Sequence, residues 1–147
     1  LVLDTYYLPP YSGRFVVDWP TVRSTAERLV DEYDIRTPSI DVAAGSLSGG
    51  NQQKVIVARE FSRDVRFVIA SQATRGLDVG SIEYIHERIV AERDRGAAIL
   101  IVSTELDEIL ALSDRILVMY RGRVVAETTP GETTPAALGL SMAGVKS

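Results

Sequence analysis

The stretch Leu47-Ser48-Gly49-Gly50-Asn51-Gln52-Gln53-Lys54 (LSGGNQQK) decides how the rest of this chain is interpreted. Two adjacent glycines follow a serine, and an apolar run over residues 55–58 begins just after the octapeptide. The pattern predicts a flexible loop that leads into a helix. The first N–H groups of a helix have no acceptor within it and its dipole is positive there, so the junction favours an anion. The simpler interpretation is a Ser-Gly-Gly turn with Ser48 as the helix cap.

The composition is that of an ordinary globular chain of about one domain. Of the 147 residues, 46% are hydrophobic and 24% are charged, and the net charge of −4 argues against a nucleic-acid partner. The absence of cysteine excludes disulfides and thiolate metal sites, and a single histidine, His86, argues against a histidine metal cluster. No apolar run approaches the roughly 20 residues of a membrane span, and no segment resembles a signal peptide.

The hydrophobic periodicity predicts strands that alternate with helices. The expected elements are a helix from Pro20 to about Asp34, helices over 51–62 and 80–95, strands over 66–70 and 97–102, a short helix ending near Leu112, and a hairpin of residues 115–120 and 123–127 around Arg121-Gly122. The two apolar strands lack alternation, which is typical of strands buried on both faces of a parallel sheet. Residues after 127 are expected to form a loosely ordered tail with one short helical turn. The order of elements predicts an α/β fold.

The octapeptide resembles the signature motif of ATP-binding cassette (ABC) ATPases, in the form seen in importers of sugars and nucleosides. Residues 35–38 (IRTP) resemble the nucleoside-importer branch. The resemblance implies an incomplete P-loop NTPase fold, the ABC cassette, with a parallel sheet, flanking helices and the remainder of a helical subdomain. It assigns residues 1–46 to that subdomain, residues 47–127 to the signature motif and the C-terminal half of the RecA-like ATPase core, and residues 128–147 to a C-terminal tail.

The resemblance also implies roles for the signature residues. The Ser48 hydroxyl and the N–H groups of Gly49 and Gly50 would contact the γ-phosphate of ATP bound to an opposite cassette, and Gln52 would be a further nucleotide contact. A helix N-terminus with a short hydroxyl is a suitable ligand for such a phosphate. The cofactors implied are ATP and Mg²⁺, and the phosphate contact forms only when two cassettes close.

The segment after the first apolar strand departs from the family pattern. The Walker B segment of the family ends in Asp-Glu, followed by Pro-Thr and then Gly-Leu-Asp. Here Ser71 and Gln72 occupy the Asp-Glu positions, Ala73 replaces the proline, and Gly76-Leu77-Asp78 matches the D-loop. Ser71 brings no charge to orient the waters of Mg²⁺, so no metal ligand is expected there. Gln72 can hydrogen-bond a water but has no basic carboxylate to activate it.

Thr104 stands at the position of the family's switch histidine. A threonine can donate a hydrogen bond to a γ-phosphate, but it cannot share charge as an imidazole does. A second interpretation, of equal weight, makes Thr104 the cap of the helix that follows. Asp78 likewise has two possible roles, because it could cross a cassette interface or cap the helix after it, and the two roles are compatible.

These departures affect the residues of hydrolysis and leave the signature motif unchanged. Importers of this type are similar in carrying two fused cassettes, the second with a degenerate Walker B segment. The chain begins on Leu1, and none of its eleven glycines belongs to a Gly-Lys-Ser/Thr phosphate loop. We therefore expect the C-terminal part of a second cassette, which supplies its signature in trans to an intact first cassette and is inactive when isolated.

The expected function is energy coupling in an ABC importer of sugars or nucleosides. The expected partners are a second cassette fused in the same polypeptide, membrane permease subunits and, indirectly, a solute-binding protein. The expected location is the cytoplasmic face of the cell membrane, as a peripheral subunit. Two alternatives remain open: a non-transport ABC ATPase, or a half-cassette remnant without enzyme activity. The residues do not identify the transported compound.

Overall fold

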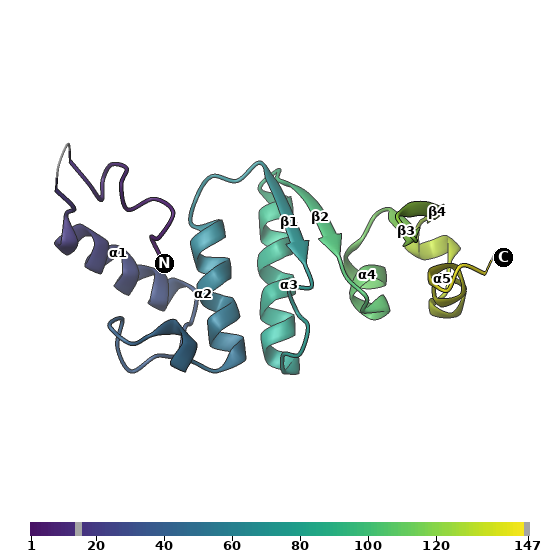
Figure 1. Ribbon diagram of the computed structural model, residues 1–147, viewed down its shortest axis with the longest axis horizontal. Coiled ribbons are helices and arrows are strands. Elements are labelled where there is room, and N and C mark those ends of the chain that lie inside the picture. Colours follow the sequence, from purple (N-terminus) through teal and green to yellow (C-terminus); the bar gives the residue numbers. More distant parts are fainter. Residues whose placement is uncertain (14–15, 146–147) are drawn as a thin grey trace. The chain divides into compact units, whose positions relative to one another are not determined.

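The computed structural model describes residues 1–13 and 16–145. The chain divides into two compact units, which are described separately. The first unit comprises Leu1–Arg66 and Thr74–Ala97, and the second comprises Phe67–Ala73 and Ala98–Ser147. Figure 1 shows the elements along the chain.

The first unit is helical. Its elements are α1 (Trp19–Glu32), the 3₁₀ turn η1 (Ala44–Ser46), α2 (Gly49–Phe61) and α3 (Val79–Asp94). A proline in the first turn of α1 and a side-chain cap at Asp18 explain the start of that helix. The predicted helices are confirmed, with each boundary within two residues of the expected one. Residues 1–13 contain turns, as the paired prolines predict.

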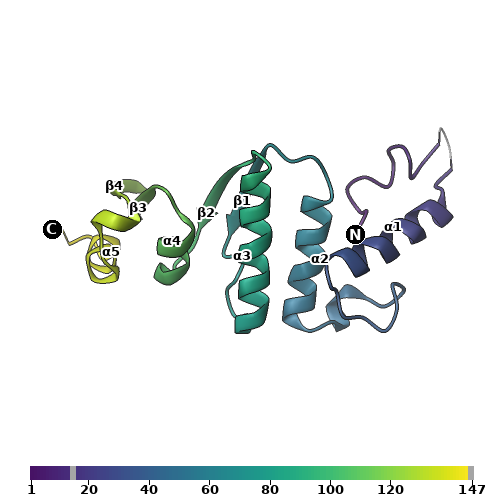
Figure 2. The same ribbon diagram turned by 180° about the vertical axis from the view of Figure 1, so that it is seen from behind.

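The core of the first unit lies among its three α-helices. Its buried apolar side chains are Leu29 of α1, Val57, Ala58 and Phe61 of α2, and Ile85 and Ile89 of α3. Helix α2 contacts both α1 and α3, and α2 and α3 stand side by side in both ribbon views (Figures 1 and 2). Helix α2 is therefore the central element of this unit.

The second unit begins with two short parallel strands, β1 (Phe67–Ser71) and β2 (Ala98–Val102). Their register pairs Phe67 with Ala98 and Ser71 with Val102, so the carboxyl ends of the strands lie side by side. Within the described residues only one face of β1 is covered, because Val68 and Ala70 are buried while Ile69 is 62% exposed. The prediction of a parallel pair is confirmed, but burial on both faces is wrong for this part of the chain.

The rest of the second unit packs around a hairpin. Helix α4 (Leu106–Leu112) precedes β3 (Ile116–Tyr120) and β4 (Arg123–Thr128), which pair antiparallel. Arg121 and Gly122 both have positive φ, as a two-residue hairpin turn requires, so the predicted hairpin is confirmed.

The residues after the hairpin are more ordered than the sequence suggested. The 3₁₀ turn η2 (Pro130–Glu132) leads to α5 (Pro135–Met142), which contacts β3. Leu138 of α5 is buried with Ile116 and Val118 of β3, and Leu106, Ile109, Leu110 and Ala126 pack around them. The expected loose order is therefore wrong for residues 135–142, where the expected short turn is an eight-residue helix that completes a small core.

Candidate functional site

The signature residues form the start of helix α2. Ser48 is the N-cap, and its Oγ accepts hydrogen bonds from the Asn51 side-chain amide at 2.9 Å and, weakly, from the Asn51 backbone N–H at 3.5 Å. Ser48 and Gly49 are exposed, whereas Gly50 is buried. The first N–H groups of a helix have no acceptor within it, so that of the exposed Gly49 is available to an anion from outside. Gly50 is buried, and its contact with a phosphate stays a prediction. The predicted cap role of Ser48 is confirmed.

The turn Gly76-Leu77-Asp78 forms the start of helix α3. Asp78 is the N-cap, and its carboxylate accepts hydrogen bonds from the Ser81 backbone N–H at 3.0 Å and from the Ser81 hydroxyl at 2.7 Å. These two bonds hold the pKa of the Asp78 carboxyl below its usual value, the side-chain bond being the larger cause. Gly76 has a φ of 75°, a conformation that glycine adopts without strain. The predicted cap role of Asp78 is confirmed.

The structure brings these two helix starts together. A Cβ added to Gly50 would lie 3.2 Å from the Ser81 Cβ and 3.4 Å from an Asp78 carboxylate oxygen, and closer still to the Ser81 hydroxyl. A Cβ on Gly49 would lie 3.8 Å from a methyl carbon of Leu77, which is ordinary contact. Residues 48–50 and 77–78, which are far apart in the sequence, thus form one site within the first unit.

The loop before α2 is held by its own side chains and by α2. The Gln52 side-chain amide donates to the Leu47 carbonyl at 2.7 Å, and the Asn51 side-chain oxygen accepts from the Arg36 N–H at 2.8 Å. Through these bonds, two polar side chains of the octapeptide hold the segment that precedes α2 in place. The structure therefore places Gln52 against the loop itself, beside Ser48.

One turn into α2, Lys54 lies in a cluster of charged and aromatic side chains. Its ammonium group is 2.6 Å from an Asp34 carboxylate oxygen and 4.5 Å from the centre of the Tyr84 ring. Arg88 lies over the rings of Tyr33 and Tyr84, at 4.7 Å and 5.2 Å. Burial raises the pKa of both tyrosines, so their hydroxyls are neutral at physiological pH.

The same cluster ties three helices together. Arg88 of α3 donates to the Glu32 carbonyl at the end of α1 at 2.7 Å and to the Tyr84 hydroxyl at 3.0 Å. Its guanidinium therefore joins the carboxyl end of α1 to α3, while Lys54 joins α2 to both. The arrangement joins α2 and α3 beyond their first turns.

The remaining candidate residues lie at the strand ends of the second unit. Ser71 ends β1 and is paired with Val102, and the Gln72 N–H donates to the Val102 carbonyl at 2.8 Å. Thr104 follows β2 by two residues and is exposed. Ser71, Gln72 and Thr104 thus lie where parallel strands end, which is the edge at which open α/β sheets bind ligands.

Two details distinguish this edge. Gln72 has a φ of 51°, and its side-chain oxygen is buried without a hydrogen-bond partner among the described residues. The N-cap of α4 is Glu105, which makes no side-chain cap bond, while the Ser103 hydroxyl accepts from the Glu105 N–H at 3.0 Å. The interpretation of Thr104 as the helix cap is therefore wrong, because the helix begins one residue later and Ser103 forms the local turn.

The residues fit the expected phosphate ligand but do not fit the expected Mg²⁺ ion. The N-terminus of α2 offers backbone N–H groups and a hydroxyl to a phosphate, as an anion site requires. At the strand ends Ser71 and Gln72 are neutral, whereas Mg²⁺ is usually bound through carboxylates. In the described part of the chain no three acidic, histidine or cysteine side chains are grouped as a metal site would need. These residues therefore do not fit a magnesium site of their own.

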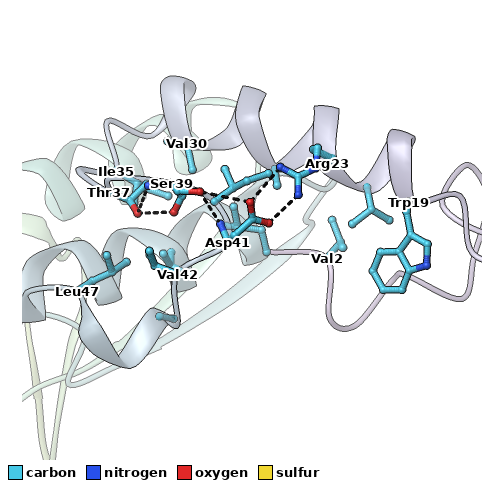
Figure 3. A pocket seen from close by; sticks show the side chains of 16 residues that line it. Val2, Trp19, Arg23, Val30, Ile35, Thr37, Ser39, Asp41, Val42 and Leu47 are labelled. Carbon is cyan, nitrogen blue, oxygen red and sulfur yellow. Dashed lines mark hydrogen bonds and ion pairs between the residues drawn. The ribbon is translucent and has the colours of Figure 1, made fainter.

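A groove of about 460 Å³ lies beside α1 in the first unit (Figure 3). Its lining is mostly apolar, and Leu47, the residue before Ser48, is part of it. Arg23 and Asp41 form a two-bond ion pair across it, at 2.7 Å and 3.2 Å. Trp19, at the start of α1, is 69% exposed and also belongs to the lining. The groove is thus adjacent to the loop that leads to the signature.

Sequence reasoning missed the residues that hold the site together. Ser81, Tyr84 and Arg88 were not singled out, although the spacing Asp78-x-x-Ser81 is that of a helix cap and its third helical residue. Tyr84 and Arg88 contact residues near positions 33 and 54, which are distant in the sequence. No short-range sequence pattern indicates these contacts. No helix in the described residues has the length and apolar character needed to cross a bilayer.

Comparison with curated proteins finds relatives of one kind. The chain is 49% identical over 144 residues to a guanosine import ATP-binding protein of Bacillus subtilis and to a nucleoside import ATP-binding protein of Lactococcus lactis. It is 36% identical over 132 residues to a ribose import ATP-binding protein of Roseobacter denitrificans. The first two matches cover 98% of this chain but 28% of each relative. The chain therefore spans less than a third of the length of these relatives. No family model matches the sequence.

Comparison with solved structures gives the fold. The chain is similar to the dimeric structure of the bacterial ABC transporter cassette MJ0796, with a TM-score of 0.65 and 22% identity. It is also similar to the ATP-binding cassette MJ1267, with a TM-score of 0.63 and 19% identity. The matches cover 80% and 89% of this chain and 51% and 50% of those structures. The arrangement of helices and parallel strands is thus that of part of such a cassette.

Proposed function

This chain belongs to the ATP-binding cassette family, and we propose that it is the C-terminal part of a second cassette in an importer of sugars or nucleosides. The observation that carries the proposal is the start of α2, where the exposed Ser48 and Gly49 present a hydroxyl and a backbone N–H group, and the buried Gly50 packs beside Asp78. The chain covers 28% of the length of each of these relatives, which supports the proposal that it is part of a longer protein.

The proposed role of the signature is to bind the γ-phosphate of ATP that a partner cassette holds. A helix N-terminus attracts an anion through its dipole and its N–H groups, and the capping hydroxyl adds a further polar contact. Because the Ser48 Oγ already accepts from Asn51, its own proton is free to be donated to a phosphate oxygen. ATP would then connect the two cassettes, with the signature supplied in trans.

The chain's own hydrolytic site is proposed to turn over ATP slowly or not at all. ATP hydrolysis needs Mg²⁺ to neutralise charge on the phosphates and a group that orients or activates the attacking water. Ser71 has no charge for the ion's waters, and Gln72 has no carboxylate. Thr104 is exposed at the adjacent strand end, and its hydroxyl can donate a hydrogen bond to a phosphate but carries no charge. Bound Mg²⁺·ATP would therefore be hydrolysed mainly at the composite site that this signature completes.

The transported compound is proposed to be a sugar or a nucleoside. The relatives named for guanosine and for nucleosides and the one named for glucose import are each 49% identical to this chain. Equal identity to both kinds gives no preference between them. Proteins of this family act on the transported compound only through their partners, so a proposed solute-binding protein would select it.

The proposed membrane partner is a permease subunit that contacts the groove beside α1. Leu47 lines this groove and directly precedes Ser48, so an apolar segment bound there would touch the loop that positions the signature. Such a contact gives a physical route from the permease to the nucleotide. It would hold the chain peripherally at the cytoplasmic face of the membrane.

The test uses the full-length protein that carries this chain, with its permease, in membrane vesicles. Ser48→Ala is expected to lower steady-state ATP hydrolysis by about tenfold or more, as loss of one positioned donor does at other sites. Gly131→Ala is the matched control, since a Cβ there meets open space. Unchanged hydrolysis in Ser48→Ala would refute the supply of the signature in trans.

The second candidate is a half-cassette without enzyme activity, which the neutral residues Ser71 and Gln72 favour. The coding sequence upstream of Leu1 separates the two. A frame that continues through a phosphate loop and a first cassette with Asp-Glu supports the importer. A start codon immediately before Leu1 supports the remnant and removes the catalytic proposal.

A further inference from the structure

The contact between Gly50 and Ser81 gives the signature a second requirement, distinct from binding phosphate. We propose that Ser81 is a positioning residue, and that Gly50 lacks a side chain because Ser81 and Asp78 pack directly against it. The start of α2 and the start of α3 would then act as one rigid piece. The inference rests on the proposed function, because it concerns how the signature is held for a nucleotide in trans.

The close approach is specific to one of the two glycines. A Cβ at position 50 would lie well under 3.0 Å from the Ser81 hydroxyl, a distance that real Cβ atoms essentially never show. At position 49 a Cβ would have only the Leu77 methyl carbon nearby, at 3.8 Å. Gly49 is exposed and Gly50 is buried. The need for room around a phosphate can therefore explain the glycine at position 49. At position 50 the glycine is explained by packing within this chain, because Ser81 and Asp78 leave no room for a side chain.

Rotation of the Ser81 side chain away from an added methyl group would cost a hydrogen bond. Its hydroxyl is held by an Asp78 carboxylate oxygen at 2.7 Å, and rotation would break that bond. Its Cβ would still lie 3.2 Å from the new methyl carbon, and an Asp78 oxygen would lie at 3.4 Å. With the bond between Asp78 and the Ser81 hydroxyl kept, the two helix starts would have to separate by about 1 Å for the methyl carbon and that hydroxyl to reach ordinary contact.

Such a separation would affect both elements that face a partner cassette. The N–H groups of α2 would move relative to the phosphate, and the Asp78 cap would move relative to the signature. A misplacement of about 1 Å can lower a rate by about 100-fold even when the altered residue is away from the reacting atoms. Initial ATP binding would be little changed, since the partner cassette holds the nucleotide before closure.

The experiment is a double-mutant cycle in the full-length protein, with kcat and KM for ATP as readouts. Gly50→Ala is expected to lower kcat by about 10- to 100-fold with KM nearly unchanged. Ser81→Gly removes both atoms that meet the methyl group, so Gly50→Ala/Ser81→Gly is expected to recover kcat to within about threefold of Ser81→Gly alone. Gly45→Ala, whose Cβ meets open space, is the control and is expected to change kcat by less than about twofold.

The outcomes separate this inference from the proposed function. If Gly50→Ala fails to fold while the double variant folds and turns over ATP, the positioning role is supported. A double variant as impaired as Gly50→Ala, in folding or in kcat, overturns it. Ser48→Ala is measured in parallel: if it lowers turnover but the double variant shows no recovery, only this inference fails. If Ser48→Ala and Gly50→Ala both leave turnover unchanged, the proposed function fails as well.

Discussion

The helix starts that carry Ser48 and Asp78 differ in kind from the strand ends that carry Ser71 and Gln72. At the helix starts, the first N–H groups of α2 and the Ser48 hydroxyl can receive an anion, while the Asp78 carboxylate caps α3. At the strand ends, the side chains of Ser71 and Gln72 carry no charge. The comparison shows that anion binding and hydrolysis have separate physical bases. The first depends on the backbone at a helix terminus, whereas the second depends on particular charged side chains.

A negative charge at the signature should produce the largest effect. Gly49→Asp would place a carboxylate beside the proposed γ-phosphate, and like charges at short range in a site shielded from water repel strongly. We expect ATP turnover of the full-length protein to fall by about 100-fold or more. Gly131→Asp adds the same charge at an exposed site with open space around it and serves as the control. Equal activity of the two variants would show that the signature does not meet phosphate.

The cluster around Arg88 tests whether the helix starts depend on the packing behind them. Arg88→Lys keeps the charge but loses the planar stacking on Tyr33 and Tyr84, for which lysine is a poor substitute. We expect a loss of about 1 kcal/mol and a fall in melting temperature of about 2–4 °C.

The matched control for that variant is Arg28→Lys. Arg28 pairs with Glu32 on the exposed face of α1, where both side chains are largely in solvent. Exposed pairs contribute about 0–1 kcal/mol, so the melting temperature should barely change. Melting is measured by scanning calorimetry of the full-length protein. Equal shifts for the two variants would mean that the stacking of Arg88 adds nothing.

Introducing carboxylates at the strand ends should give this region the charged side chains that hydrolysis requires. In the full-length protein, Ser71→Asp with Gln72→Glu would give the second site a group for Mg²⁺ and a base for water. If the other parts of that site are present, a second active site would raise total ATP turnover by at most about twofold. A larger rise would show that the unaltered protein is limited by this site, and the proposed division of roles would be wrong.

The smallest effect concerns pH and the cap of α3. The pKa of Asp78 is lowered in the folded chain by its bonds to Ser81, below its ordinary value of 3.8. The cap therefore contributes stability fully above pH 3.8, and this contribution is lost as the pH falls through the lower folded-state pKa.

Asp78→Asn isolates this contribution, because asparagine also caps helices but does not titrate. The difference in unfolding midpoint between Asp78→Asn and the unaltered protein should be constant at neutral pH and should change only below pH 3.8. It is measured by denaturant unfolding at a series of pH values. A difference that already varies between pH 5 and 8 would contradict the assignment.

The sequence was sufficient for the caps of α2 and α3, although not for the cap of α4 or the partner residue Ser81. Ser48 before a Gly-Gly pair and Asp78 three residues before Ser81 are cap patterns, and a cap depends on only a few neighbouring residues. The hairpin at Arg121-Gly122 followed from turn chemistry in the same way. The helix α5 near the end of the chain could not be predicted in this way. Its position depends on the packing of Leu138 on β3, and no local sequence pattern indicates that contact.

By itself the sequence determined most of the helices and strands, the signature motif and the absence of charge at Ser71 and Gln72, because these depend on residue type and short-range spacing. Only the tertiary structure decided that Gly50 meets Ser81, and that Lys54 and Arg88 join three helices. Those contacts link residues about 30 or more positions apart, such as Gly50 with Ser81, Lys54 with Tyr84 and Arg88 with Glu32. Their physical reason is close packing, in which a neighbour in space determines how much room a side chain has.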